Sequence, residues 1–153
     1  MGSKDERLRF TGKKAEEIIQ LGIGMETENG LELHKVEAAY LVKNGKLKTR
    51  KSFEELVAGD KERYAVYEDL RSRGYVVRLS RESELFRINR KGFRRGEERT
   101  AYILKVIKAP FTLTVKELFE DLALSAKMRK QFVYAIIDGK EIRYITLGRM
   151  TFP

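Results

Sequence analysis

The feature that most limits the possible folds is an uninterrupted apolar run at residues 132–137. A run of this length without polar interruption is typical of a strand that is buried on both faces. It ends at Asp138-Gly139-Lys140, a sequence that favours a tight hairpin turn. Residues 141–147 then follow as the returning strand. We therefore predict a hairpin whose first strand lies centrally in a sheet covered by other elements.

A helix, a turn and a strand are predicted earlier in the same half of the chain. Tyr64, Tyr67 and Leu70 fall on one face of a helix, with charged side chains on the other. Gly74 ends this helix, and residues 75–79 read as the strand that follows.

Further strands are expected at residues 84–88 and 101–107. Thr114-Val-Lys-Glu117 has the form of a capping box and predicts the start of another helix. The buried face of that helix is expected to carry Val115, Leu118, Phe119 and Leu122.

The first third of the chain predicts a smaller unit. Residues 12–29 suggest a short helix or strand that runs into a turn, and residues 31–43 suggest a helix, with Leu33, Val36 and Tyr40 on one face. Residues 46–51 form a basic connector or one strand.

A second capping box, Ser52-Phe-Glu-Glu55, begins a short helix, and Gly59-Asp60 marks the expected boundary. The predicted class is α/β: a small amino-terminal α/β domain at residues 1–60, and a mixed sheet flanked by helices at residues 61–153.

The composition of the chain excludes several kinds of site and protein class. The chain has no cysteine, which excludes disulfides, a thiolate nucleophile and a cysteine-based zinc site. It has no apolar run of about 18 residues that could span a membrane, and its first ten residues lack the apolar segment of a signal peptide. We therefore expect a soluble, cytoplasmic protein.

The net charge of +9 points to a polyanionic partner. A highly charged surface of the thermophile type is the alternative. The excess is clustered, however, and this clustering favours RNA over an ordinary solvated loop. The clustered residues are Arg87, Arg90, Lys91, Arg94, Arg95 and Arg99.

The segment YAVYEDLRSRGYVVR at residues 64–78 resembles the helix-turn-strand signature of archaeal tRNA-splicing endonucleases. The resemblance continues through residues 86–92, 99–104 and 128–138, and it reaches residues 31–56 in a weaker form. It implies a compact version of the family's amino-terminal domain, followed by its restriction-endonuclease-like carboxy-terminal domain, which holds the nuclease chemistry.

In that family, RNA is cut without a metal by attack of a 2′-hydroxyl on the adjacent phosphate. The reaction needs a base, an acid and a cation, which the family supplies with a tyrosine, a histidine and a lysine. By alignment of the motifs, Asn89 stands in the place of the tyrosine and Arg99 in the place of the histidine. Lys130 matches the lysine, although it is also consistent with a solvated lysine at the entrance to a strand.

A count of residue types supports a degenerate site. His34 is the only histidine of the chain, and we expect it on a helix surface in the other domain. Asparagine does not exchange protons in the useful range, and arginine stays protonated. A family arginine that clamps a bulged base is replaced by Ala123. The resemblance therefore implies a structural subunit, which joins a catalytic subunit as two copies of each.

The resemblance also implies how such a subunit assembles. Structural subunits of this family place an acidic loop into a basic cleft of the catalytic subunit, and the matching carboxylates are Asp138 and Glu141. Tyr144 and Phe152, on and beyond the last strand, are candidates for further docking contacts. The alternative is an exposed hairpin whose Asp-Gly serves turn geometry alone.

Three other functions remain open. One is an active RNA endonuclease with an altered site of Lys130, Arg99 and Tyr102. Another is a metal-dependent nuclease, but the chain lacks a convincing Asp…Glu-x-Lys arrangement. The third is a stand-alone basic RNA-binding module. The favoured prediction is a non-catalytic subunit that binds precursor tRNA and requires no cofactor or metal.

Overall fold

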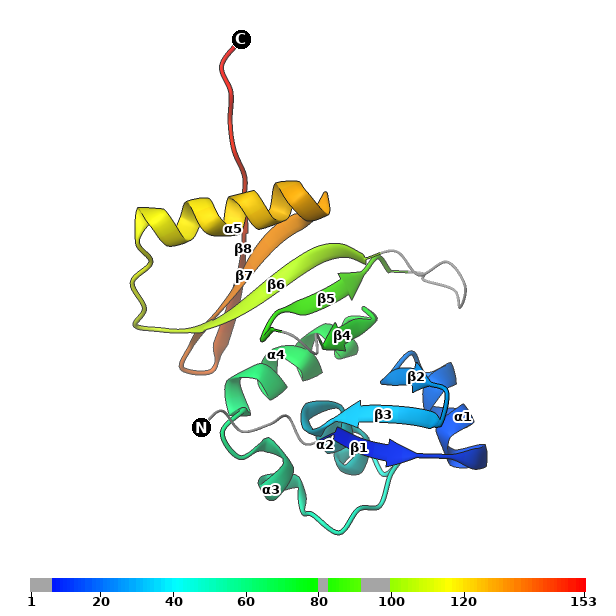
Figure 1. Ribbon diagram of the computed structural model, residues 1–153. Coiled ribbons are helices and arrows are strands. Elements are labelled where there is room, and N and C mark those ends of the chain that lie inside the picture. Colours follow the sequence, from blue (N-terminus) through cyan, green and yellow to red (C-terminus); the bar gives the residue numbers. More distant parts are fainter. Residues whose placement is uncertain (1–6, 80–82, 92–99) are drawn as a thin grey trace.

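Two sheets organise the chain, a three-stranded one near the amino terminus and a five-stranded one in the rest (Figure 1). The computed structural model describes residues 7–79, 83–91 and 100–153. Both sheets carry helices, so the predicted mixed α/β class is confirmed.

The first sheet has the order β1-β3-β2, and its strands are antiparallel. Its elements are β1 (Arg7–Phe10), α1 (Gly12–Gln20), β2 (Met25–Thr27), β3 (Gly30–His34), α2 (Lys35–Lys43) and α3 (Phe53–Val57). The capping box predicted at Ser52 is present, because the serine hydroxyl accepts from Glu55 N and the Glu55 carboxylate accepts from Ser52 N.

The helix predicted over residues 31–43 is wrong in its first part, which is strand β3. Leu31 and Leu33 are buried on either side of the half-buried Glu32, a period of two that belongs to a strand. Only Val36 and Tyr40 of the predicted helical face belong to α2. The connector at residues 46–51 is not a strand; it is anchored by Leu47, which is 5% exposed.

His34 is also placed differently from the prediction. It is fully buried and forms the N-cap of α2, where its Nδ1 accepts a hydrogen bond from Val36 N at 3.1 Å. Glu37 completes this cap by accepting from His34 N at 2.9 Å. The only histidine of the chain therefore begins a helix in the amino-terminal part.

The second sheet has the order β4-β5-β6-β7-β8. Strands β6 and β7 are parallel, and the other neighbours are antiparallel, so the predicted mixed sheet is confirmed. Its elements are α4 (Lys61–Ser72), β4 (Val77–Leu79), β5 (Phe86–Asn89), β6 (Thr100–Lys108), α5 (Val115–Met128), β7 (Gln131–Asp138) and β8 (Glu141–Leu147).

Strand β7 is buried on both faces, as its apolar run predicts. Val133 and Ala135 join the main core, whereas Phe132 and Tyr134 join a second cluster beneath α5. The hairpin turn is confirmed as well: Asp138 pairs with Glu141, and Gly139 has a φ of 62°, which glycine adopts without strain.

The buried face predicted for α5 is only partly correct. The capping box at Thr114 is present, and Leu118 packs against the cluster beneath the helix. Val115 and Phe119, however, are 65% and 57% exposed. The helix contacts the sheet through Leu118, Leu124 and Met128, so Val115 and Phe119 point away from it.

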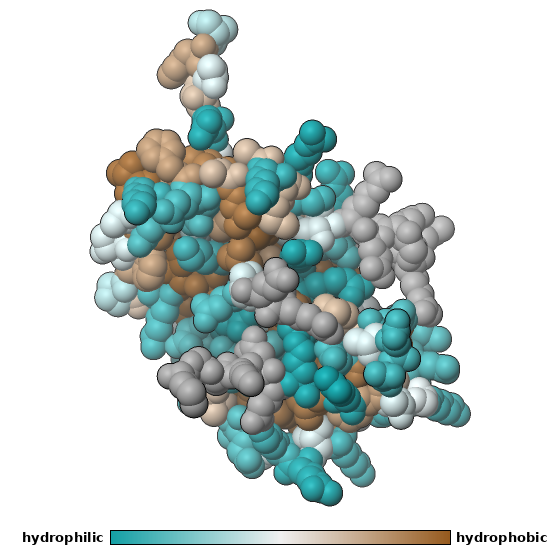
Figure 2. Space-filling view, viewed as in Figure 1, coloured by the Kyte–Doolittle hydropathy of each residue, from teal (hydrophilic) through white to brown (hydrophobic). Residues whose placement is uncertain are grey.

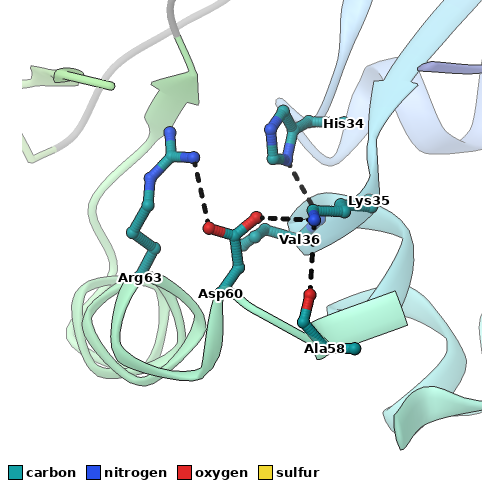
Figure 3. Close-up of polar contacts among 6 residues, drawn as sticks. All are labelled: His34, Lys35, Val36, Ala58, Asp60 and Arg63. Atoms are coloured by element: carbon teal, nitrogen blue, oxygen red, sulfur yellow. Dashed lines mark hydrogen bonds and ion pairs between the residues drawn. The ribbon is translucent and has the colours of Figure 1, made fainter. Parts of the chain in front are cut away.

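The two parts of the chain meet at α2 and α4 and share one core. At this junction, the carboxylate of Asp60 forms ion pairs with Lys35 Nζ at 3.0 Å and with Arg63 Nη1 at 3.6 Å (Figure 3). Lys35 Nζ also donates to the carbonyl of Ala58 at 3.4 Å. These contacts fix the start of α4 against the start of α2.

Candidate functional site

The residues to which the sequence analysis assigns catalytic positions belong to one edge of the five-stranded sheet, where β5 ends and β6 and β7 begin. Asn89 ends β5 and pairs with Thr100 at the start of β6. Gln131 begins β7 and pairs with Tyr102. Lys130 directly precedes Gln131 and therefore reaches the same edge as Asn89. Arg99 directly precedes Thr100 in the sequence and lies outside the described residues.

Asn89 is buried at this edge, with 1% of its surface exposed. Strand alternation would place it on the exposed face with Arg87, but the register shifts between Ile88 and Asn89, and both side chains turn inward. The backbone N–H of Asn89 donates to Val76 O at 3.0 Å. Among the described residues its amide nitrogen has no hydrogen-bond partner. A buried carboxamide can neither take nor give the proton of an RNA hydroxyl.

Lys130 has a fixed backbone and a half-buried side chain. It follows Arg129, which ends α5 with a φ of 55°. Lys130 N donates to Ser125 O at 3.1 Å, and the Ser125 hydroxyl donates to Lys130 O. No ion pair to Lys130 occurs within the described part of the chain. The residue can supply positive charge at the edge, but Asn89, which lies beyond β6 at the same edge, supplies no acid or base.

Three members of the predicted RNA-binding cluster lie in the described part of the chain. Arg87, Arg90 and Lys91 are all exposed, at the end of β5 and just beyond it. Lys91 Nζ lies 5.1 Å from the centroid of the Tyr75 ring, a cation–π contact that holds this side chain near the edge. Arg94, Arg95 and Arg99 lie outside the described residues, and their part in the cluster stays a prediction.

The predicted docking residues have different surroundings. Asp138 and Glu141 are exposed at the β7–β8 turn, and Glu141 forms an ion pair with Arg143 at 2.7 Å. Phe152 is 79% exposed on the extended segment after β8. Tyr144 instead points to α4 within the same chain.

The hydroxyl of Tyr144 donates to Asp69 Oδ2 at 2.6 Å. Burial raises the pKa of Tyr144, and this hydrogen bond raises it further. The hydroxyl of Tyr144 is therefore already hydrogen-bonded to Asp69 of its own chain, and its docking role stays a prediction.

Part of an exposed apolar surface was missed by the sequence interpretation, which named Phe152 for docking but expected Val115 and Phe119 to be buried. Hydrophobic side chains gather over α5 and the segment that follows β8 (Figure 2). The most exposed are Phe111, Val115, Phe119, Met150 and Phe152. The signal was the width of the apolar stripe on α5, which is broader than one contact with a sheet can cover.

Two further structural observations concern metals and membranes. Within residues 7–79, 83–91 and 100–153, no three histidine or carboxylate side chains gather as they would around a metal ion. No helix in this same part of the chain has the length and apolar character needed to cross a membrane.

Comparisons with known proteins identify a family for each of the two parts of the chain. The family described as tRNA intron endonuclease, catalytic C-terminal domain, matches residues 61–144. The family described as tRNA intron endonuclease, N-terminal domain, matches residues 4–59. The chain therefore belongs to the tRNA intron endonuclease family.

Individual relatives are named tRNA-splicing endonucleases. The protein from Methanothermobacter thermautotrophicus is 30% identical over 125 residues, which cover 74% of each chain. The protein from Pyrococcus abyssi is 31% identical over 150 residues, which cover 87% of this chain and 85% of the relative. The protein from Methanosarcina mazei is 34% identical over 143 residues, and this chain spans only 40% of its length.

Proposed function

We propose that this chain is a non-catalytic subunit of a tRNA intron endonuclease. It would assemble with a catalytic subunit, two copies of each, and help that subunit bind and cut precursor tRNA. The products would be a 2′,3′-cyclic phosphate and a 5′-hydroxyl end. The observation that carries the proposal is Asn89, a buried carboxamide at the edge where the family tyrosine is expected.

The placement of the remaining proton-transfer groups supports the proposal. His34 is buried in the amino-terminal part and is occupied as the cap of α2. Arginine at the place of the family histidine cannot act as a base at neutral pH. Lys130 and Arg99 could stabilise phosphate charge, but charge stabilisation without an acid or base lacks two of the three functions that the reaction needs.

Exposed charged side chains would perform the two other roles of such a subunit, docking to the catalytic subunit and binding RNA. Asp138 and Glu141 are two exposed carboxylates at a hairpin turn, which suits a basic cleft on the catalytic subunit. The cluster of Arg87, Arg90 and Lys91, extended in sequence by Arg94, Arg95 and Arg99, would bind RNA phosphates.

Substitution of Lys130 tests the division of labour between the subunits. In the reconstituted complex, Lys130→Ala in this chain should leave the single-turnover cleavage rate within about twofold. The same substitution of the corresponding lysine in the catalytic subunit should lower the rate by about 100-fold or more, because it removes a charge from the transition state.

Rates would be measured with both variant complexes at saturating enzyme, after gel filtration has shown equal assembly. A large loss of rate from Lys130→Ala with intact assembly and intact RNA binding would show that this chain takes part in the chemistry, contrary to the proposal.

A further inference from the structure

The basic connector after α2 forms one side of a groove on the amino-terminal part. The groove has a volume of about 560 Å³ and lies between β1 and residues 48–51. Leu8 and Phe10 contribute apolar surface to it, and Lys48, Arg50 and Lys51 line it from the connector. This surface lies at the opposite end of the molecule from α5 (Figure 1).

The positive charges of the groove differ in how far they are already neutralised. Lys35 is held by Asp60 at 3.0 Å, and Arg9 lies 3.5 Å from Glu32. Lys48 and Arg50 are exposed, and neither has an ion pair among the described residues. Within the described part of the chain, the charges of these two side chains are therefore available to a ligand.

The groove offers little negative charge in return. Among the described residues, its lining contains one carboxylate, that of Glu55, which accepts from the backbone N–H and the hydroxyl of Ser52 at 3.3 and 3.2 Å. The local shape is also held in place, because Thr49 Oγ1 donates to Lys51 O at 2.7 Å and Leu47 is buried beneath the connector. A fixed, positively charged groove with an aromatic ring in its lining suits a nucleic-acid backbone.

We propose that this groove is a second RNA-binding site, which binds the phosphate backbone of precursor tRNA through Lys48 and Arg50. It is separate from the cluster at Arg87, Arg90 and Lys91, and it would contact the RNA away from the cleavage site. The inference rests on the proposed function only in taking precursor tRNA as the ligand. It concerns binding, whereas the proposed function concerns which subunit performs the cleavage.

The test is binding of a fluorescently labelled precursor tRNA to the purified chain, measured by anisotropy at several salt concentrations. The test variant is Lys48→Ala with Arg50→Ala. The control variant is Lys13→Ala with Lys116→Ala, which removes the same charge from exposed positions of α1 and α5 outside the groove. Circular dichroism melting curves would confirm that both variants are folded.

The groove variant should bind about tenfold more weakly at about 0.1 M salt, and its plot of log affinity against log salt should be shallower by about 2, since two phosphate contacts are lost. The control should keep the wild-type slope. Equal effects of both variants, no effect of either, or no RNA binding by the wild-type chain would each overturn the proposal.

One further outcome would point to another ligand. If the groove variant kept its affinity for RNA but no longer assembled with the catalytic subunit, the groove would be a protein-docking surface and the proposal would be wrong. Cleavage by this chain alone would contradict the proposed function and would leave these binding results unaffected.

Discussion

At the scale of single residues, Glu37 shows how one carboxylate organises the amino-terminal part. It is 3% exposed, and its two oxygens accept separate backbone hydrogen bonds, from Gly24 N at 2.8 Å and from His34 N at 2.9 Å. Burial raises the pKa of this carboxyl, and the two hydrogen bonds partly oppose the rise. Glu37 thereby joins the turn before β2 to the start of α2.

Glu37→Gln should lower the free energy of unfolding by about 1–3 kcal/mol, because the amide has only one acceptor oxygen and its NH₂ group would face a buried N–H donor. Urea unfolding at pH 7 would measure the change. Glu54→Gln, at an exposed position of α3, is a suitable control and should have little effect. A loss at Glu37 no larger than at Glu54 would contradict the capping role.

At the scale of elements, the junction between α2 and α4 depends on one acid shared by two cations. The side chains of Lys35, Asp60 and Arg63 are only 24%, 15% and 13% exposed. Among the described residues, Asp60→Asn would leave both partly buried cations without a charged partner, and we expect it to destabilise the fold by about 1–3 kcal/mol.

Thermal or urea unfolding of Asp60→Asn would be compared with Asp138→Asn, which removes an exposed carboxylate. Equal stability of the two variants would show that the junction does not depend on this contact.

The same two helices carry a contact that depends on pH. Glu68 accepts from Lys43 Nζ at 2.8 Å and from the Tyr64 hydroxyl at 2.7 Å. Burial works to raise the pKa of Glu68, but these hydrogen bonds outweigh it and hold the pKa below its usual value of 4.5. A carboxyl with a lowered pKa in the folded state stabilises the fold above pH 4.5, and this contribution is lost as the pH falls through the folded-state pKa.

Glu68→Gln should therefore differ most from the wild type near pH 7, and the difference should shrink as the pH falls below 4.5 and through the folded-state pKa of Glu68. Urea unfolding of both proteins over this pH range would test the expectation. A difference in stability that is constant with pH would contradict it.

The elements also show what the sequence predicts well and where local patterns are insufficient. The apolar run of β7, the Asp-Gly turn and the two capping boxes each depend on neighbouring residues, and all were predicted correctly. Strand β3 was mistaken for helix because Leu33 stands three residues before Val36, so a helical spacing runs across the boundary between β3 and α2. The orientation of α5 depends on contacts with β6 and β7, which no local pattern contains.

At the scale of the whole molecule, the candidate site was predicted in part. The order of motifs places Asn89 at the end of one strand and Lys130 before another, and the sheet brings these two ends to one edge, on either side of β6. The burial of Asn89 follows from a register shift at the end of β5, and no pattern in the sequence predicts that shift. The basic groove joins β1 to a connector about 40 residues later in the chain, a long-range pairing that the composition could not indicate.

The most direct test of the central claim is cleavage of a precursor tRNA containing a bulge-helix-bulge motif by this chain alone, in molar excess, compared with an equimolar mixture with the catalytic subunit. Both reactions would contain a chelator. We expect cyclic-phosphate products from the mixture alone, with the two subunits eluting together in gel filtration. Cleavage by this chain alone at a rate comparable to that of the mixture would contradict the assignment of a non-catalytic subunit.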